Sequence, residues 1–192
     1  MPLGNDAPFD YAWLLGEAVT AFSSHSLPYC LIGAVALGAY GRPRATQDLD
    51  LLILADRTGS DTYLNPLLKR GFAVSSEWQD ANPMAGDVVL RLHHPSAPHF
   101  PLDLVFATSE LHHTTLKRRQ PQSLGGIHVS VSSPEDLILL KFAASRPRDF
   151  DDAMTVVANP NAQLDLDYLW PWAERLGLQS ELHYVLISSK RE

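Results

Sequence analysis

Residues 31–51, LIGAVALGAYGRPRATQDLDL, decide the fold of this chain. A short apolar run at Tyr29–Ile32 predicts a strand, and the glycine after it predicts a turn into a helix of small residues, Val35–Tyr40. The segment Gly41–Pro43 stops that helix. A second strand is predicted at Asp48–Leu54, because it is polar only at its start and otherwise apolar on both faces, which is typical of an interior strand.

Three aspartates stand on two predicted strands. Asp48 and Asp50 are two residues apart on one strand, so both side chains leave the same face about 7 Å apart. Two carboxylates this close repel each other, and burial raises their pKa values unless a cation neutralises them. Asp103 lies within the apolar strand Leu102–Phe106, and the three acids converge if the two strands are neighbours. Oxygen ligands suit Mg²⁺ or Mn²⁺, and three carboxylates can support two such ions.

A simpler interpretation of these acids stays open. They could be strand-end residues in solvent or partners of Arg42 and Arg44. For a bare DxD pair that interpretation is the better one, because such pairs are common. Because Asp103 lies inside a second apolar strand, the metal-site interpretation and the simpler interpretation become about equally good.

Gly33 lies at the turn between the first strand and the short helix. A glycine there lets the backbone approach a ligand, and a helix N-terminus offers N–H groups and a positive dipole to phosphate. The turn is not a P-loop, since no GKS or GKT follows, and it is not GxGxxG. The joint order matters: a glycine turn followed by the Asp48 strand places phosphate donors beside metal ligands.

The rest of the chain predicts an α/β (α+β) fold, a mixed sheet flanked by helices with a C-terminal helical extension. We expect a core over residues 1–132 and a helical region over 133–192 that packs on it. Ser133-Pro134 is a helix start with proline at the first position. The other expected strands are Phe72–Trp78, Asp87–Leu92 paired antiparallel with Leu102–Phe106, and Ile127–Val131, and the other expected helices are Asp10–Phe22, Asp61–Arg70, Pro134–Ser145, Asp149–Val157, Asp165–Leu176 and Gln179–Ser188.

Composition narrows the class of protein. The chain has 192 residues, 45% of them hydrophobic, and a formal net charge of -7, which argues against a generally basic surface for nucleic acid. Cys30 is the only cysteine, so no intrachain disulfide forms and a reducing, cytoplasmic location is expected. The start MPLGNDAPFD is unlike a signal sequence, and the apolar run Tyr29–Tyr40 is too short to span a bilayer.

Two blocks of sequence carry a family resemblance. Gly33-Ala34 followed by Arg44–Asp50, RATQDLD, and a later strand acid at Asp103 resembles the polymerase-beta-like nucleotidyltransferase superfamily. More narrowly, the chain is similar to the AbiEii-type and minimal nucleotidyltransferases of bacterial toxin–antitoxin and defence systems. Ser133–Lys141, SPEDLILLK, and the segment RDFDD that starts at Arg148 resemble a helical block of that family. The resemblance covers about residues 27–157.

The resemblance implies a metal-dependent transfer of NMP from an NTP to an acceptor hydroxyl on a protein, a tRNA end or a small molecule. It implies that Asp48, Asp50 and Asp103 bind Mg²⁺ or Mn²⁺ and that Gly33 and its neighbours cradle the β- and γ-phosphates. Ala34 departs from the second Gly or Ser of the family, which removes a hydroxyl but keeps the backbone N–H. We expect Gly33→Val to weaken NTP binding strongly with only a small loss of thermal stability.

Three further residues have two interpretations each. Arg44 and Thr46 either order the turn before the acids or touch the triphosphate. Lys141 could reach phosphate from the helical region, although a solvated helix lysine is the better explanation from sequence alone.

The same resemblance leaves the biological role open. A cognate toxin or antitoxin is a possible partner of such a protein. The alternative to an enzyme is a catalytically degenerate binding protein of the same fold that acts as an antitoxin or partner module. Three acids on apolar strands favour the enzyme, because a binding module has no need to keep them.

Overall fold

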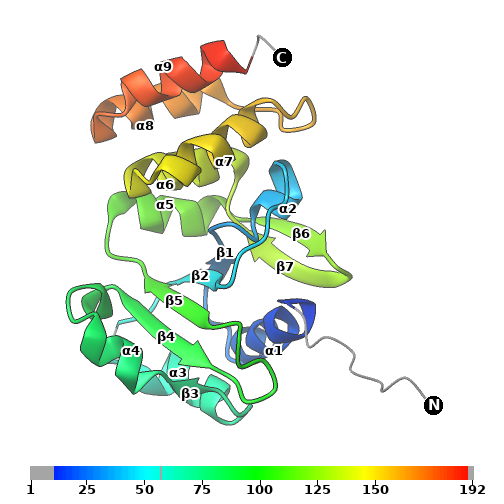
Figure 1. Ribbon diagram of the computed structural model, residues 1–192, viewed down its shortest axis with the longest axis vertical. Helices are drawn as coiled ribbons and strands as arrows, with labels where there is room; N and C mark the ends of the chain where they lie inside the picture. Colours follow the sequence, from blue (N-terminus) through cyan, green and yellow to red (C-terminus); the bar gives the residue numbers. More distant parts are fainter. Residues whose placement is uncertain (1–10, 57, 190–192) are drawn as a thin grey trace.

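The computed structural model describes residues 11–56 and 58–189. Its strands are β1 Tyr29–Leu31, β2 Leu49–Ile53, β3 Ala73–Val74, β4 Val89–His93, β5 Leu102–Phe106, β6 Gln120–Leu124 and β7 Ile127–Val131. They form one mixed sheet in the order β3-β4-β5-β2-β1-β7-β6 (Figure 1). β2 pairs in parallel with β5 and antiparallel with β1, so the strands of the deciding stretch lie in the middle of the sheet.

Helices cover both faces of this sheet. Their bounds are α1 Tyr11–Ser23, α2 Leu37–Tyr40, α3 Ser60–Leu68, α4 Ser76–Ala81, α5 Glu110–Arg118, α6 Pro134–Ala144, α7 Pro147–Val157, α8 Leu166–Leu176 and α9 Gln179–Ser188, with a single 3-10 turn at Ala85–Asp87. α1 packs against α3 and β7, whereas α5 packs against β1 and β2. The predicted mixed α/β fold is therefore confirmed.

The two faces of β2 are set by its alternating residues. Leu49, Leu51 and Ile53 are fully buried in the main core, to which α1 and α3 contribute. Leu52 lies on the other face, in a small cluster with Leu116 of α5. Asp50 alternates with Leu49 and Leu51, so it faces the α5 side. Burial of each leucine contributes about 1.5–3 kcal/mol, and a register slip of one residue would turn all of them to the opposite face and bring Asp50 into the main core.

The C-terminal helices stack at one end of the molecule (Figure 1). α6 packs against α5, α7 and α8, and α9 packs against α7 and α8. The Oγ of Ser133 accepts the backbone N–H of Asp136 at 3.2 Å, with Pro134 in the first turn, which confirms the predicted helix start. Leu137 and Phe142 of α6 belong to the same apolar cluster as Leu31 of β1. The division of the chain at residue 132 stays a prediction.

The sequence-based scheme differs from the structure at three places. The segment Phe72–Trp78 is not one strand: β3 ends at Val74, and α4 begins at Ser76 because Ser75-Ser76-Glu77 is a helix-start sequence. The helix α5 and the strand β6 are absent from the sequence-based scheme. The expected helix Val35–Tyr40 is shorter, since residues 34–36 form a turn and α2 has four residues.

The expected start of the first helix at Asp10 lies outside the described residues. Elsewhere the expected elements agree with the structure to within a few residues. None of the helices in the described ranges combines the length and the apolar character needed to cross a membrane.

Candidate active site

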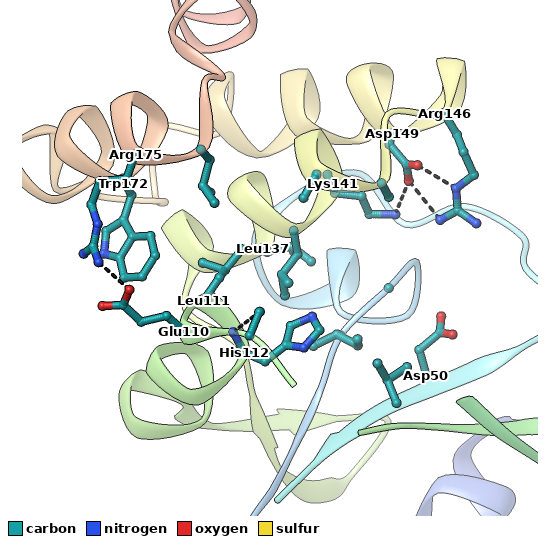
Figure 2. Close-up of a pocket in the computed structure, with 18 residues that line it drawn as sticks. Asp50, Glu110, Leu111, His112, Leu137, Lys141, Arg146, Asp149, Trp172 and Arg175 are labelled. Carbon is teal, nitrogen blue, oxygen red and sulfur yellow. Dashed lines mark hydrogen bonds and ion pairs between the residues drawn. The ribbon is translucent and has the colours of Figure 1, made fainter. Parts of the chain in front are cut away.

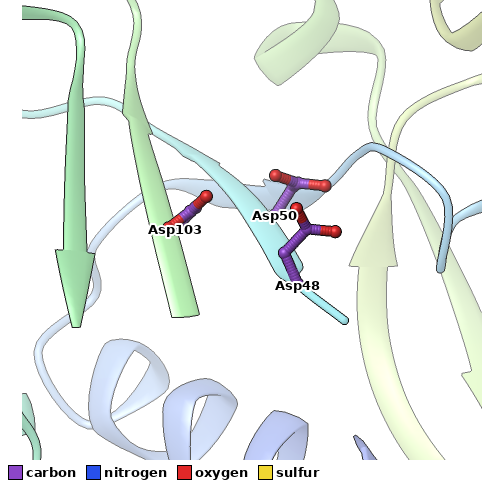
Figure 3. Close-up of side chains that lie close together, drawn as sticks. All are labelled: Asp48, Asp50 and Asp103. Atoms are coloured by element: carbon purple, nitrogen blue, oxygen red, sulfur yellow. The ribbon is translucent and has the colours of Figure 1, made fainter. Parts of the chain in front are cut away.

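The three predicted acids meet at the amino-terminal ends of β2 and β5, on the sheet face that α5 covers. Asp50 of β2 stands directly beside Asp103 of the parallel strand β5, and Asp48 immediately precedes β2. One carboxylate oxygen from each of the three lies within 4.8 Å of the others (Figure 3). The convergence follows from the register, because parallel pairing brings two apolar strands with one acid each into alignment. Within the described ranges, this is the only group of three His, Cys, Asp or Glu side chains close enough to share a metal ion.

Neighbouring side chains hold two of the acids. The Oγ1 of Thr46 donates to Oδ1 of Asp48 at 2.5 Å. Arg91 of β4 grips Asp103 with two hydrogen bonds, from Nε to Oδ1 at 2.8 Å and from Nη2 to Oδ2 at 2.6 Å. Arg44 pairs instead with Asp152, so the interpretation of the three acids as its partners is wrong.

Asp50 is the acid whose ionisation the fold opposes most. Burial, followed by the charges of Asp48 and Asp103, raises the pKa of Asp50 to about 7. Lys141 and Arg146 act in the opposite direction but do not cancel this effect. The negative charge of these carboxylate oxygens is not balanced by the neighbouring cationic side chains. Such a set of oxygen donors fits a hard divalent cation, Mg²⁺ or Mn²⁺.

The glycine turn lies against Asp50. Gly33 has φ +70, and a Cβ built on it would meet Oδ2 of Asp50 at 2.0 Å. The structure argues against the expectation that Gly33→Val costs little stability, because the backbone conformation disfavours a side chain and the carboxylate of Asp50 would have to move. No hydrogen bond from the backbone N–H of Ala34 or Val35 occurs within the part of the chain that the structure describes. These N–H groups, and not the dipole of the four-residue helix α2, are what the turn offers an anion.

A buried network of ion pairs joins α6 and α7, the helices that lie above the acids. Nζ of Lys141 lies 2.6 Å from Oδ2 of Asp152 and 3.1 Å from Oδ1 of Asp149, and Lys141 is only 3% exposed. Arg44 reaches Asp152 from the loop before β2, with Nε to Oδ1 at 2.7 Å and Nη2 to Oδ2 at 2.9 Å. Lys141 is therefore a buried group and not a solvated helix lysine. The network ties the loop that carries Asp48 to α6 and α7.

Two connected cavities open above the acids. The larger, of about 880 Å³, is lined by both residues of the DxD pair, the glycine turn and four basic side chains, and its principal residues are Gly33, Ala34, Arg44, Thr46, Asp48, Asp50, Lys141, Arg146 and Arg148. The smaller, of about 570 Å³, shares Asp50 and Lys141 with the first and extends beneath α5, α6 and α8 to Trp172 (Figure 2). Each is large enough to hold a small-molecule ligand.

Several residues at these cavities were missing from the sequence-based set. Arg146 donates to Asp149 from Nε at 2.7 Å, while Arg148 makes no side-chain hydrogen bond or ion pair within the described residues. His112 of α5 lines the same cavity as Asp50 (Figure 2), and burial, then the neighbouring His113, lowers its pKa. Only the RPRD segment at residues 146–149 gave a signal, as a short basic run beside the predicted helix.

Converging carboxylates, a glycine turn with free N–H groups and the helices above them match the arrangement that the resemblance to polymerase-beta-like nucleotidyltransferases implies. The family model described as "Nucleotidyl transferase AbiEii toxin, Type IV TA system" matches residues 13–176. The chain belongs to this family, and the resemblance seen in its two sequence blocks is confirmed. No curated protein matches the chain.

Solved structures share the fold at low sequence identity. An antigenic nucleotidyltransferase-like protein from Paracoccidioides brasiliensis has a TM-score of 0.52 and 20% identity, over 88% of this chain and 89% of that chain. JHP933 from Helicobacter pylori has a TM-score of 0.52 and 13% identity, over 99% and 96% of the two chains. The lincosamide antibiotic adenylyltransferase LnuA, solved with lincomycin bound, has a TM-score of 0.50 and 14% identity, over 76% and 92%.

Proposed function

We propose that the protein transfers NMP from an NTP to an acceptor hydroxyl with the help of Mg²⁺ or Mn²⁺. The observation that carries the proposal is the meeting of three carboxylates within 4.8 Å, two of which, Asp48 and Asp50, line a cavity that the glycine turn borders. Asp48, Asp50 and Asp103 would hold the metal ion, which supplies Lewis-acid stabilisation of charge on the transferred phosphoryl group. The carboxylates alone could not stabilise this charge, because their own negative charge repels the phosphate.

The order of the strands supports an in-line reaction, in which the acceptor and the leaving group lie on opposite sides of the α-phosphorus. Gly33 follows β1, Asp50 lies on β2 and Asp103 lies on β5, and these strands are neighbours in the order β1-β2-β5. A triphosphate whose α-phosphate lies over Asp50 can place its β- and γ-phosphates at the free N–H groups of Ala34 and Val35. The acceptor then enters from the Asp103 side, opposite the leaving group.

The step balances with these groups. The acceptor oxygen attacks the α-phosphorus, the bond from that phosphorus to the bridging oxygen breaks, and pyrophosphate leaves. Asp103 takes the proton of the acceptor hydroxyl. Thr46 orients Asp48 through its 2.5 Å hydrogen bond, and Arg44 orders the same loop through Asp152. Lys141 acts on the triphosphate through its charge, from a fixed position in the buried network.

The biological role follows from the family. Its description as a toxin family of type IV systems supports a role as a toxin with an antitoxin partner, and an NTP substrate is consistent with a cytoplasmic location. The acceptor is a hydroxyl of a protein, a tRNA end or a small molecule. The binding-module alternative has no observation in its favour, because the acids, the turn and the open cavity all occur together.

The test is a transfer assay with purified protein, NTPs labelled at the α-phosphate, Mg²⁺ or Mn²⁺, and a cell lysate separated into protein, RNA and small-molecule fractions. We expect label in one fraction with the wild-type protein, and none with Asp48→Ala or Asp50→Ala. Asp80→Ala, an exposed acid on α4, is the matched control and should behave as the wild type. Equal labelling by Asp50→Ala would refute the proposed site.

A further inference from the structure

Arg91 is an unexpected member of the acidic site. It stands opposite Asp103 in the antiparallel pair β4–β5, so the sheet register itself brings the two side chains together. The guanidinium meets both oxygens of the carboxylate, at 2.8 Å and 2.6 Å, in the planar fork that arginine forms with carboxylates. The Asp103 side chain is 9% exposed and that of Arg91 is 23% exposed, so solvent screens this pair only in part.

Contacts with α4 fix the position of Arg91. The indole of Trp78 on α4 lies against the guanidinium, with the ring centroid 4.7 Å from Cζ. Gln79, the next residue of α4, accepts the backbone N–H of Arg91 at 3.1 Å through Oε1. The same guanidinium lies 3.9 Å from Oδ2 of Asp48, through Nη2. Arg91 is thus held between β5 and the start of β2 as a cation of the site.

The charges of the site can now be counted. Three carboxylates and one guanidinium give a net charge of about -2, which one divalent cation neutralises. Both oxygens of Asp103 already accept hydrogen bonds from Arg91, whereas those of Asp50 have no donor among the described residues. Asp48 and Asp50 are therefore the available ligands before a nucleotide binds.

We propose that Arg91 is a positioning residue that keeps Asp103 out of the metal ligand set of the nucleotide-free protein and holds it toward the acceptor side. This inference rests on the proposed function, since it concerns the same carboxylates. In the nucleotide-free protein Asp103 is then held for the acceptor proton and is not yet a metal ligand. Asp48 and Asp50 would hold the first divalent ion, and the guanidinium of Arg91 supplies positive charge beside Asp103 that a second ion would otherwise bring.

The test measures the affinity of the nucleotide-free protein for Mn²⁺ alone, from the free-ion signal in electron paramagnetic resonance. Arg91→Gln should bind Mn²⁺ roughly tenfold more tightly than the wild type, which is the scale of one lost unit charge beside a divalent ion at water-like screening. Arg91→Lys keeps the charge and should stay within about threefold of the wild type by the same argument. Arg70→Gln breaks an ion pair with Glu17 on the other face of the sheet and is the matched control, expected to leave Mn²⁺ affinity unchanged.

A double variant decides the question of ligands. Arg91→Gln with Asp103→Asn removes both members of the pair and leaves the local net charge unchanged. If Asp103 is not a ligand, this protein binds Mn²⁺ within about threefold of the wild type. A large loss of affinity in the double variant, or no change in Arg91→Gln, would overturn the inference. Asp50→Asn tests the metal site itself: if it binds Mn²⁺ like the wild type, the proposed metal site fails, and the inference fails with it.

Discussion

The carboxylate of Asp50 occupies the space that a β-carbon on Gly33 would need. Only 2.0 Å separates the position of that carbon from Oδ2 of Asp50. The turn after β1 and the acid on β2 are therefore fitted to each other before any substrate arrives. The φ of +70 at Gly33 sets the direction of the turn, and the absence of a side chain lets Asp50 keep its rotamer. A single residue therefore shapes both the turn proposed to bind phosphate and the acid proposed to bind metal.

Gly33→Ala is therefore expected to damage both functions. The left-handed conformation alone costs about 1–2 kcal/mol for an alanine, and the methyl group forces Asp50 to move. We expect a lower melting temperature, weaker Mn²⁺ binding and no transfer. Gly38→Ala is the matched control, since a Cβ there meets Cδ2 of Leu124 at an ordinary 3.7 Å and favours the helix. A Gly33→Ala protein that melts and binds Mn²⁺ as the wild type does would contradict this account.

Asp50→Asn is expected to stabilise the metal-free protein. The folded-state pKa of Asp50 is raised to about 7, above the unfolded value, so the stability associated with its neutral form is full below about pH 4 and is lost as the pH rises through 7. At pH 8 an asparagine removes this cost, which is at most roughly 4 kcal/mol. Thermal melts in a chelator should show a gain of several degrees at pH 8 and none at pH 4.

Metal provides the second half of that experiment. Mn²⁺ should raise the melting temperature of the wild-type protein and leave that of Asp50→Asn nearly unchanged. Only the wild-type protein keeps the carboxylate of Asp50, whose charge a bound Mn²⁺ ion neutralises. Asp80→Asn serves as the control acid on α4. If asparagine at position 50 lowers the melting temperature at pH 8 without metal, the charge repulsion at this site has been misassigned.

The sequence could predict the acids because their pattern is local. The alternation of Asp48, Leu49 and Asp50 and the single acid in Leu102–Phe106 identify buried strands that carry charge, and both strands form as expected. What the pattern lacked was a partner for Asp103. Arg91 alternates with leucines on its own strand like any outward-facing residue, and its pairing depends on the β4–β5 register, which no local sequence feature fixes.

Lys141 was misplaced for a different reason. α6 is buried on nearly every side, so its sequence has no polar face against which a buried lysine could be recognised. Its partners, Asp149 and Asp152, lie on the next helix, one turn apart, and only the packing of α7 on α6 brings them to Nζ. The helix α5 was missed because most of its residues are polar, and only Leu111, Thr115 and Leu116 are buried.

Asp152→Asn is expected to destabilise the protein strongly. Asp152 is 3% exposed and accepts from Lys141 and from both Nε and Nη2 of Arg44. Breaking one member of a buried ion pair costs about 3–5 kcal/mol, because the remaining charge stays buried. Asp151→Asn, the exposed neighbour on α7, should change stability by less than about 0.5 kcal/mol. Chemical denaturation of both variants measures the difference, and equal stabilities would remove the network from the account of the fold.

The same network predicts sensitivity to acid. Burial favours the neutral forms of Asp149 and Asp152, but hydrogen bonds from Arg146, Arg44 and Lys141 outweigh it and lower both pKa values. A lowered folded-state pKa contributes stability that is full above about pH 4 and is lost as the pH falls below it. The wild-type protein should therefore lose more stability between pH 5 and pH 3 than Asp152→Asn does, by denaturation at each pH.

Arg148 is the basic residue best placed to test nucleotide binding without disturbing the fold. It lines the larger cavity, is exposed, and makes no ion pair within the described residues, whereas Arg146 and Lys141 are held by Asp149. We expect Arg148→Gln to raise the Kd for a non-hydrolysable NTP analogue roughly fivefold, the scale of one solvent-exposed charge contact, with an unchanged melting temperature. The dependence of Kd on salt concentration should become shallower, because one cation fewer faces the triphosphate. Arg42→Gln is the control, since this exposed arginine lines a separate cavity behind α7. Titration calorimetry at two salt concentrations measures both effects, and equal affinities for Arg148→Gln and Arg42→Gln would place the triphosphate outside the cavity above Asp48 and Asp50.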